Sequence, residues 1–208
     1  MAEYSYKREN DVYRLYESER PMTTVKGNLF FAKSESLAKQ LVEAFEKGAS
    51  RTSGESILTY HYFYCDLSAA GTLEEHVKKL CEGVDEEALL SDPYLTLCKP
   101  YFNKHEAACL YAAELPDAYR QMDLYQIAAC LALQILYESK VLPYLIMTEI
   151  IRNVEEEWSY GLLVENFLDA VVEYDGKTKD TNAEPYHREI MQLSRTIDAF
   201  VFYTTLED

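Results

Sequence analysis

Short runs of alternating apolar and polar side chains occupy the first seventy residues, a pattern typical of half-buried β-strands. The run DVYRLYES (11–18) alternates in this way, and MTTVKGNLFF (22–31) holds two β-prone segments separated by Lys26, Gly27 and Asn28. The run ESILTYHYFYCDL (55–67) is rich in aromatic and β-branched residues, which favours another strand. We therefore expect a small antiparallel sheet in this region.

One helix is expected between these strand segments. Ser34 stands where an N-cap is required, and Gly48 stands where a helix ends. Apolar residues recur between them at spacings of three and four, namely Leu37, Ala38, Leu41, Val42 and Phe45. This spacing predicts an amphipathic helix that covers the sheet.

From Thr72 onward the signals are helical. The run TLEE (72–75) is a capping box, Asp85 stands as a second cap, and Pro116 suits a first helical turn. The segment 124–137 is apolar on nearly every face, as expected of a helix buried in a bundle, and Pro143 opens a helix expected to run to about residue 160. The predicted fold is α+β, with an N-terminal sheet-and-helix region over 1–70 and a mainly helical C-terminal domain over 71–208.

Charge and composition exclude several classes of partner. Thirty-six acidic against 20 basic residues give a formal net charge of −16, which repels phosphate backbones and anionic lipid. The longest apolar run, 127–133, is too short to cross a bilayer, which takes about 20 residues. The five cysteines form no C-x-x-C pair and lie mostly in apolar segments, as reduced thiols do (Cys65, Cys81, Cys98, Cys109 and Cys130). Together with a polar N-terminus, these features predict a cytoplasmic protein that binds no nucleic acid and inserts into no membrane.

Catalytic and metal-binding motifs are absent from the sequence. It contains no G-x-S-x-G, P-loop, G-x-G-x-x-G or H-E-x-x-H pattern. His61 and Cys65 are four apart, but His61 falls in a segment expected to be a strand, where that spacing is too long for joint ligation. His105 and Cys109 are also four apart, but no second pair at a recognised metal-binding spacing accompanies them. We expect no enzyme, no cofactor and no metal, although a Cys-His pair assembled only in the folded chain stays open.

Three consecutive acids precede the single tryptophan in EIIRNVEEEWSYG (149–161). On a helical wheel of about 100° per residue, one sector holds the apolar residues Met147, Ile150, Ile151, Val154 and Trp158. Glu156 points away from this sector, while Glu155 and Glu157 flank it. The three acids therefore cannot form one carboxylate pair, and they are either a solvated face or a contact for a partner.

Two stretches of the chain resemble a family of assembly chaperones that bind the alpha subunit of the F1 ATP synthase in mitochondria and alphaproteobacteria. The first, YRLYESERPMTTVKGNLFFAKSESLAKQLVEAFEKG (13–48), is similar to the family's strand, Arg-Pro step, Gly-Asn turn and helix. The second, LPDAYRQMDLYQIAACLALQILYESKVLPYLIMTEIIRNVEEEW (115–158), is similar to its buried helix ending in Ser and the following helix with an acidic motif. Together they cover about two-fifths of the chain. This chain has Thr24-Val25 where the family has Thr-Pro, and Ala44-Phe45 where it has Glu-Trp.

The resemblance implies a function in complex assembly. An acid of the family's motif acts on the client protein, and its best match by position is Glu156, with Glu155 and Glu157 one residue away. The implied role is a non-enzymatic assembly chaperone whose client is the F1 ATP synthase alpha subunit or a related protein. Two rival hypotheses are a small-molecule-binding or enzymatic domain with a pocket between the two regions, and a divergent relative with another partner.

Overall fold

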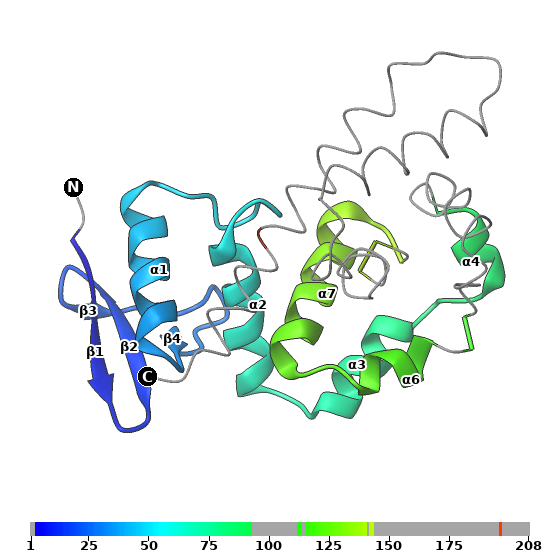
Figure 1. The fold of residues 1–208 in the computed structure, drawn as a ribbon, viewed down its shortest axis with the longest axis horizontal. Helices are drawn as coiled ribbons and strands as arrows, with labels where there is room; N and C mark the ends of the chain where they lie inside the picture. Colours follow the sequence, from blue (N-terminus) through cyan, green and yellow to red (C-terminus); the bar gives the residue numbers. More distant parts are fainter. Residues whose placement is uncertain (1–2, 93–111, 114, 141, 144–195, 197–208) are drawn as a thin grey trace, which may run out of the picture.

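A computed structural model of the chain describes residues 3–92, 112–113, 115–140, 142–143 and 196 (Figure 1). The N-terminal part contains four short strands and a first helix, and helices follow. In chain order the elements are β1 (Tyr4–Glu9), β2 (Val12–Glu17), β3 (Arg20–Pro21), β4 (Phe31–Ala32), α1 (Glu35–Glu46), α2 (Ile57–Ala69), α3 (Leu73–Cys81), α4 (Glu86–Leu90), α6 (Leu115–Arg120) and α7 (Leu124–Tyr137). The predicted α+β class is confirmed.

Strand β2 is the centre of the sheet. It pairs antiparallel with β1 from Tyr4↔Glu17 to Glu9↔Val12, and it also pairs with β3 and β4. Tyr13 and Leu15 of β2 are buried while Arg14 between them is only half-buried, as the predicted alternation requires, but Tyr16 on the other face is buried too.

Helix α1 covers this sheet, as the apolar spacing predicts. The Ser34 hydroxyl accepts a hydrogen bond from the Leu37 amide at 3.1 Å and caps the first turn. Leu37, Leu41 and other apolar residues of one face are buried, and the helix contacts β1, β2 and β4. The Phe45 ring stacks on Tyr4 of β1 with centroids 5.0 Å apart. The sheet and α1 therefore share one core.

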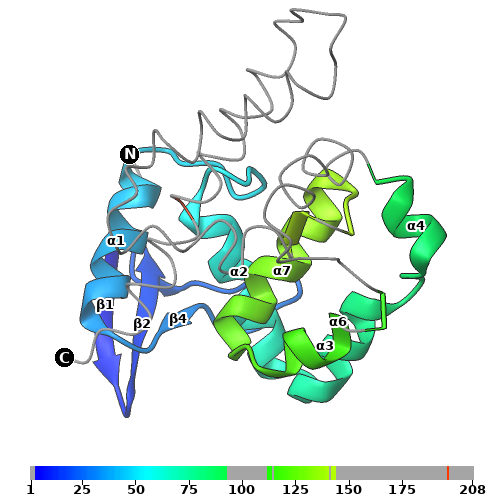
Figure 2. The ribbon, with the colours of Figure 1, turned by 45° about the vertical axis from the view of Figure 1, so that its right-hand side comes forward.

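The segment predicted as a strand at 55–67 is helical, and this prediction is wrong. Helix α2 spans Ile57–Ala69, and its buried residues are Leu58, Thr59, Tyr60, His61, Tyr64 and Cys65. Figures 1 and 2 both show α2 between α1 with the sheet on one side and α7 on the other. A helix buried on several sides needs no polar face, so its sequence carries no 3.6-residue period and its β-prone residues dominate the local signal.

Helices α3 and α7 begin at capping boxes. Thr72 caps α3 together with Glu75, as predicted, and Asp123 caps α7 together with Gln126. Helix α7 has the bounds expected from the sequence, and most of its residues are buried. It packs along α2, where the Tyr64 and Tyr125 rings stack with centroids 3.8 Å apart and planes 8° apart. Within the part of the chain that the structure describes, no helix is long and apolar enough to span a membrane.

His61 gives the fold a defined dependence on pH. Its ring is fully buried and its Nε2 donates to the Phe31 carbonyl oxygen at 2.7 Å. Burial lowers the pKa of His61 from 6.5 to about 4, although the bond to Phe31 opposes that shift. The unfolded chain takes up this proton as the pH falls below 6.5, while the folded chain does not until about pH 4, so stability is lost across that window.

We expect the free energy of unfolding of the wild-type chain to fall by roughly 2 kcal/mol more than that of His61→Gln between pH 7 and pH 5. Glutamine has a similar size and can donate to the same carbonyl, but it does not titrate. Urea unfolding of both proteins at the two pH values measures the difference. Between pH 7 and pH 8 the free energies of unfolding of the two proteins should change in parallel. If they also change in parallel down to pH 5, the lowered pKa of His61 is contradicted.

Candidate functional site

The acidic site predicted at Glu155, Glu156 and Glu157 lies outside the described residues, as do His105 and Cys109. The structure does describe the end of the helix that precedes it in the chain. Helix α7 ends at Tyr137, its C-cap Glu138 has a left-handed φ of 50°, and Ser139 and Lys140 then break the helix before Pro143. The contacts that hold this break in place are therefore of interest.

A buried pair of side chains holds the break in place. Asp92, only 5% exposed, accepts from the Ser139 hydroxyl at 2.9 and 3.0 Å and from the Lys140 amide at 2.7 Å. The Ser139 oxygen in turn accepts from the Leu142 amide at 2.9 Å. Ser139 is the serine that ends the buried helix in the stretch 115–158, and in the structure it ties the end of α7 to the chain just after α4.

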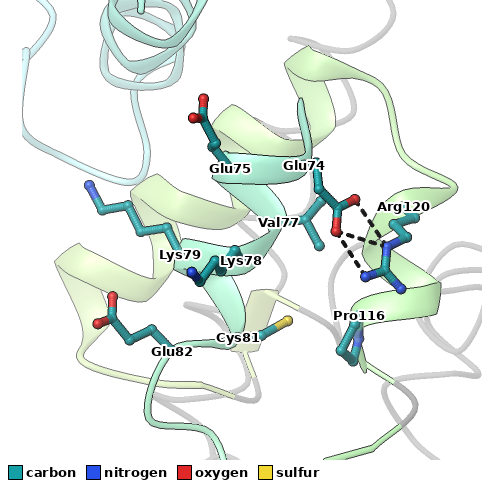
Figure 3. Close-up of a pocket in the computed structure, with 9 residues that line it drawn as sticks. All are labelled: Glu74, Glu75, Val77, Lys78, Lys79, Cys81, Glu82, Pro116 and Arg120. Atoms are coloured by element: carbon teal, nitrogen blue, oxygen red, sulfur yellow. Dashed lines mark hydrogen bonds and ion pairs between the residues drawn. The ribbon is translucent and has the colours of Figure 1, made fainter. Parts of the chain in front are cut away.

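A groove lies between α3 and α6, with a volume of about 850 Å³ (Figure 3). We call it the α3–α6 groove. Val77, Cys81 and Pro116 supply its apolar lining, and charged side chains surround them (Glu74, Glu75, Lys78, Lys79, Glu82 and Arg120). The groove is wide and open, so it is suited to contact with a protein surface rather than to enclosing a small molecule.

An ion pair joins the two helices of this groove. Arg120 of α6 donates from Nε and Nη2 to the Glu74 carboxylate of α3 at 2.9 to 3.3 Å (Figure 3). Its Nη1 donates to Asp117 at 2.7 Å. These bonds lower the pKa of Glu74 and raise that of Arg120. Because the partners are about half exposed, at 48% and 64%, the pair orients α6 more than it stabilises the fold.

The described lining of this groove contains no nucleophile paired with a base. The thiol among the described lining residues is that of Cys81, and burial raises its pKa. The thiolate needed for nucleophilic attack is therefore disfavoured at neutral pH. No histidine is among the described lining residues. The described lining of this groove therefore contains no thiol activated by a histidine.

A second, smaller concavity lies on the other side of α3, against α7. Its volume is about 390 Å³ and it shares Lys79 and Glu82 with the α3–α6 groove. Ile135 of α7, 54% exposed, lines it beside Gln134, whose amide donates to the Leu80 carbonyl at 3.3 Å. The exposed face of α3 thus carries charged and apolar side chains on both flanks.

His61 and Cys65 do come together, contrary to the expectation that a strand would separate them. They lie one turn apart on α2, with Nε2 and Sγ 3.6 Å apart, and both face the Phe31 carbonyl. Burial raises the pKa of Cys65 to about 12 and lowers that of His61 to about 4. The thiol and the imidazole are both neutral and buried at pH 7, so this pair is inert as a nucleophile and base.

The described cysteines agree with the prediction of reduced thiols. Cys65 and Cys130 are buried thiols, and Cys81 is a half-buried thiol. Among the described residues, no group of three or more His, Cys, Asp or Glu side chains is placed to hold a metal ion.

Exposed apolar side chains are few in the described part of the chain. Those that are large and exposed are Val25, Leu29, Leu73 and Ile135. Two of them, Val25 and Leu29, belong to the hairpin between β3 and β4, for which the sequence predicts two β-prone segments separated by Lys26, Gly27 and Asn28. In the sequence, the feature that marks this hairpin is Val25, an apolar residue beside Lys26 and Gly27 at a position where a turn favours polar residues.

Comparison with known proteins identifies the fold. No protein family model matches the chain, and no curated protein matches its sequence. The structure is similar to a solved structure of a point mutant of P. denitrificans Atp12p, with a TM-score of 0.52 and 14% identity over 98% of this chain and 96% of that one. Atp12p is an F1 ATPase assembly factor. The expected fold is therefore confirmed, and the identity is low enough that the likeness concerns the fold alone.

The buried pair at the end of α7 leads to a test of stability. We expect Ser139→Ala to lower the free energy of unfolding by roughly 2 kcal/mol, because it removes the donor to Asp92 and the acceptor for the Leu142 amide. Ser91→Ala, at an exposed serine near Asp92, should change it by less than about 0.5 kcal/mol. Urea denaturation measures both. Equal stability of the two variants would show that the pair does not hold the helix end.

Proposed function

We propose that this chain is a non-enzymatic assembly chaperone that binds a protein client, and that the client is the alpha subunit of the F1 ATP synthase or a related subunit. The observation that carries the proposal is the likeness to Atp12p over almost the full length of both chains. It is supported by the motifs at 13–48 and 115–158, which resemble the family of chaperones for that subunit.

The described surface is compatible with a protein client. A chaperone for one subunit must cover apolar surface that would otherwise aggregate, so it needs apolar contacts within a charged surrounding. The α3–α6 groove and the exposed apolar side chains Val25, Leu29 and Ile135 have this character. The rival enzymatic function finds no support in the buried, neutral pair of His61 and Cys65.

We propose further that Glu156, with Glu155 and Glu157 beside it, contacts the client. This rests on the position of the acids in the family motif and on the helical wheel, which directs Glu156 away from the apolar sector. We also propose that the chain divides into the regions 1–70 and 71–208, since α2 ends at Ala69 and a short connection then leads to α3.

The test of this function uses the purified F1 alpha subunit of the same organism, diluted from urea. The wild-type chain should suppress its aggregation, measured by light scattering, and form a complex that size-exclusion chromatography isolates. Glu156→Lys should weaken the complex at least about tenfold, because it reverses a charge at the contact. Failure of the wild-type chain to suppress aggregation would overturn the proposed client.

Glu46→Lys is the matched control for that charge reversal. Glu46 is exposed in the last turn of α1, and the described residues offer it no ion pair. Glu46→Lys changes the net charge by the same amount as Glu156→Lys but is made outside the acidic motif, so this variant should bind the client as the wild type does. If Glu46→Lys weakens the complex as much as Glu156→Lys, the effect is one of overall charge and Glu156 is not the contact.

A further inference from the structure

The hairpin tip, residues 24–28, presents an apolar side chain entirely to solvent. Val25 is 100% exposed, and Leu29 just beyond the tip is 50% exposed. Leu29 forms an isolated β-bridge with Thr23. Met22, which precedes Thr23, and Phe30, which follows Leu29, are buried in the core. The base of the hairpin is therefore part of the fold, and its tip projects from the fold.

Backbone hydrogen bonds define the tip as a tight loop. The Thr24 amide donates to the Asn28 carbonyl at 2.8 Å, and the Gly27 amide donates to the Thr24 carbonyl at 2.9 Å. Gly27 has a φ of 82°, which favours glycine even though no atom lies within 4 Å of an added Cβ. A three-residue loop that ends in a left-handed glycine is a common hairpin connection, so the conformation of the tip is well determined.

Asp66 of α2 fixes this loop to the core. Its Oδ1 accepts from the Thr24 hydroxyl at 2.5 Å and from the Asn28 side-chain amide at 2.8 Å, and its Oδ2 lies 3.7 Å from Lys26 Nζ. The Thr24 hydroxyl oxygen also accepts from the Asn28 backbone amide at 3.2 Å. The Asp66 side chain is only 17% exposed. Both ends of the tip are thus tied to one carboxylate that helix α2 holds in place.

Folding does not account for the choice of valine at this position. A fully exposed side chain buries no area, so Val25 adds nothing to the core. A rigid loop, however, loses little conformational entropy when it binds, and an apolar side chain at its apex can fill a pocket of a partner. The rigidity and the exposure together are what a binding contact requires.

The charge of the tip indicates the chemistry of the partner. Lys26, 72% exposed, is the one charged residue between Thr23 and Phe30, in a chain whose net charge is −16. The Lys26 ammonium lies 3.7 Å from Asp66 but keeps most of its side chain exposed, so it can also meet an acid of a partner, which most of this acidic surface would repel. The complementary surface is an apolar pocket that accepts a branched aliphatic side chain and has a carboxylate at its rim.

We infer that the hairpin tip is a docking element, in which Val25 enters an apolar pocket of the client protein and Lys26 meets an acid beside that pocket. Asp66 is a positioning residue that preorganises the tip. The inference rests on the proposed function, since it names a contact for the same client. It concerns a surface of the N-terminal region, separate in the sequence from Glu156.

Binding of variants to the purified F1 alpha subunit, measured by biolayer interferometry, tests this inference. Val25→Ser should weaken binding at least about tenfold because the pocket loses its aliphatic group, whereas Val25→Ile should stay within about threefold of the wild type. Leu73→Ser, at an apolar position of α3 that is 39% exposed, should leave binding unchanged. Circular dichroism verifies that each variant is folded.

Asp66→Ala tests the positioning role. It should speed hydrogen exchange of the Asn28 backbone amide and weaken binding, while the double variant Val25→Ser with Asp66→Ala should bind no more weakly than Val25→Ser alone. Wild-type affinity in Val25→Ser, or an equal loss in Leu73→Ser, would overturn the hairpin inference and leave the proposed function standing. Absence of any binding by the wild-type chain would overturn both.

Discussion

The burial of α2 on several sides is the constraint on which the rest of this structure depends. One flank receives the Phe31 carbonyl of β4, to which the His61 ring donates, and another receives α7 through the stacked rings of Tyr64 and Tyr125. Each contact is made by a side chain that would be costly to bury alone, because an imidazole and a phenol carry polar atoms. The sheet with α1 and the helical region therefore meet on one element, and neither has a complete core without it.

Helix α2 also determines where the candidate surfaces lie. Its last turns carry Asp66, which holds the hairpin tip, and its end at Ala69 is followed directly by Thr72, the cap of α3. The tip and the α3–α6 groove are thus anchored within a few residues of each other in the sequence. A change in how α2 packs would move both, so the surfaces of the two regions are coupled through a single rigid helix.

Local signals made much of this fold predictable. Capping residues such as Ser34 and Thr72 act within one helical turn, and the alternation of β2 follows from one buried face, so both can be read from neighbouring residues. The sequence did not predict helix α2 because a helix buried on several sides lacks the 3.6-residue hydrophobic period. The pairing of Asp92 with Ser139 joins residues 47 apart, and no local pattern reveals it. Of the proposed contacts, the helical wheel and the family resemblance together singled out Glu156, which lies outside the described residues, whereas the tip at Val25 becomes apparent only through its exposure and the hydrogen bonds of Asp66.

The residues that preserve the fold differ from those that select a client. At 14% identity the likeness to Atp12p is one of fold, and in this chain the packing around α2 and the hydrogen bonds at the end of α7 stabilise that fold, because these residues are buried in mutual contact. Exposed positions are free to change without loss of stability. The hairpin tip is such a position, and it is also where this chain departs from the family, with Thr24-Val25 in place of Thr-Pro. A substitution at an exposed tip of this kind can alter the fit to a binding partner without altering the fold, so likeness of structure does not by itself identify a partner.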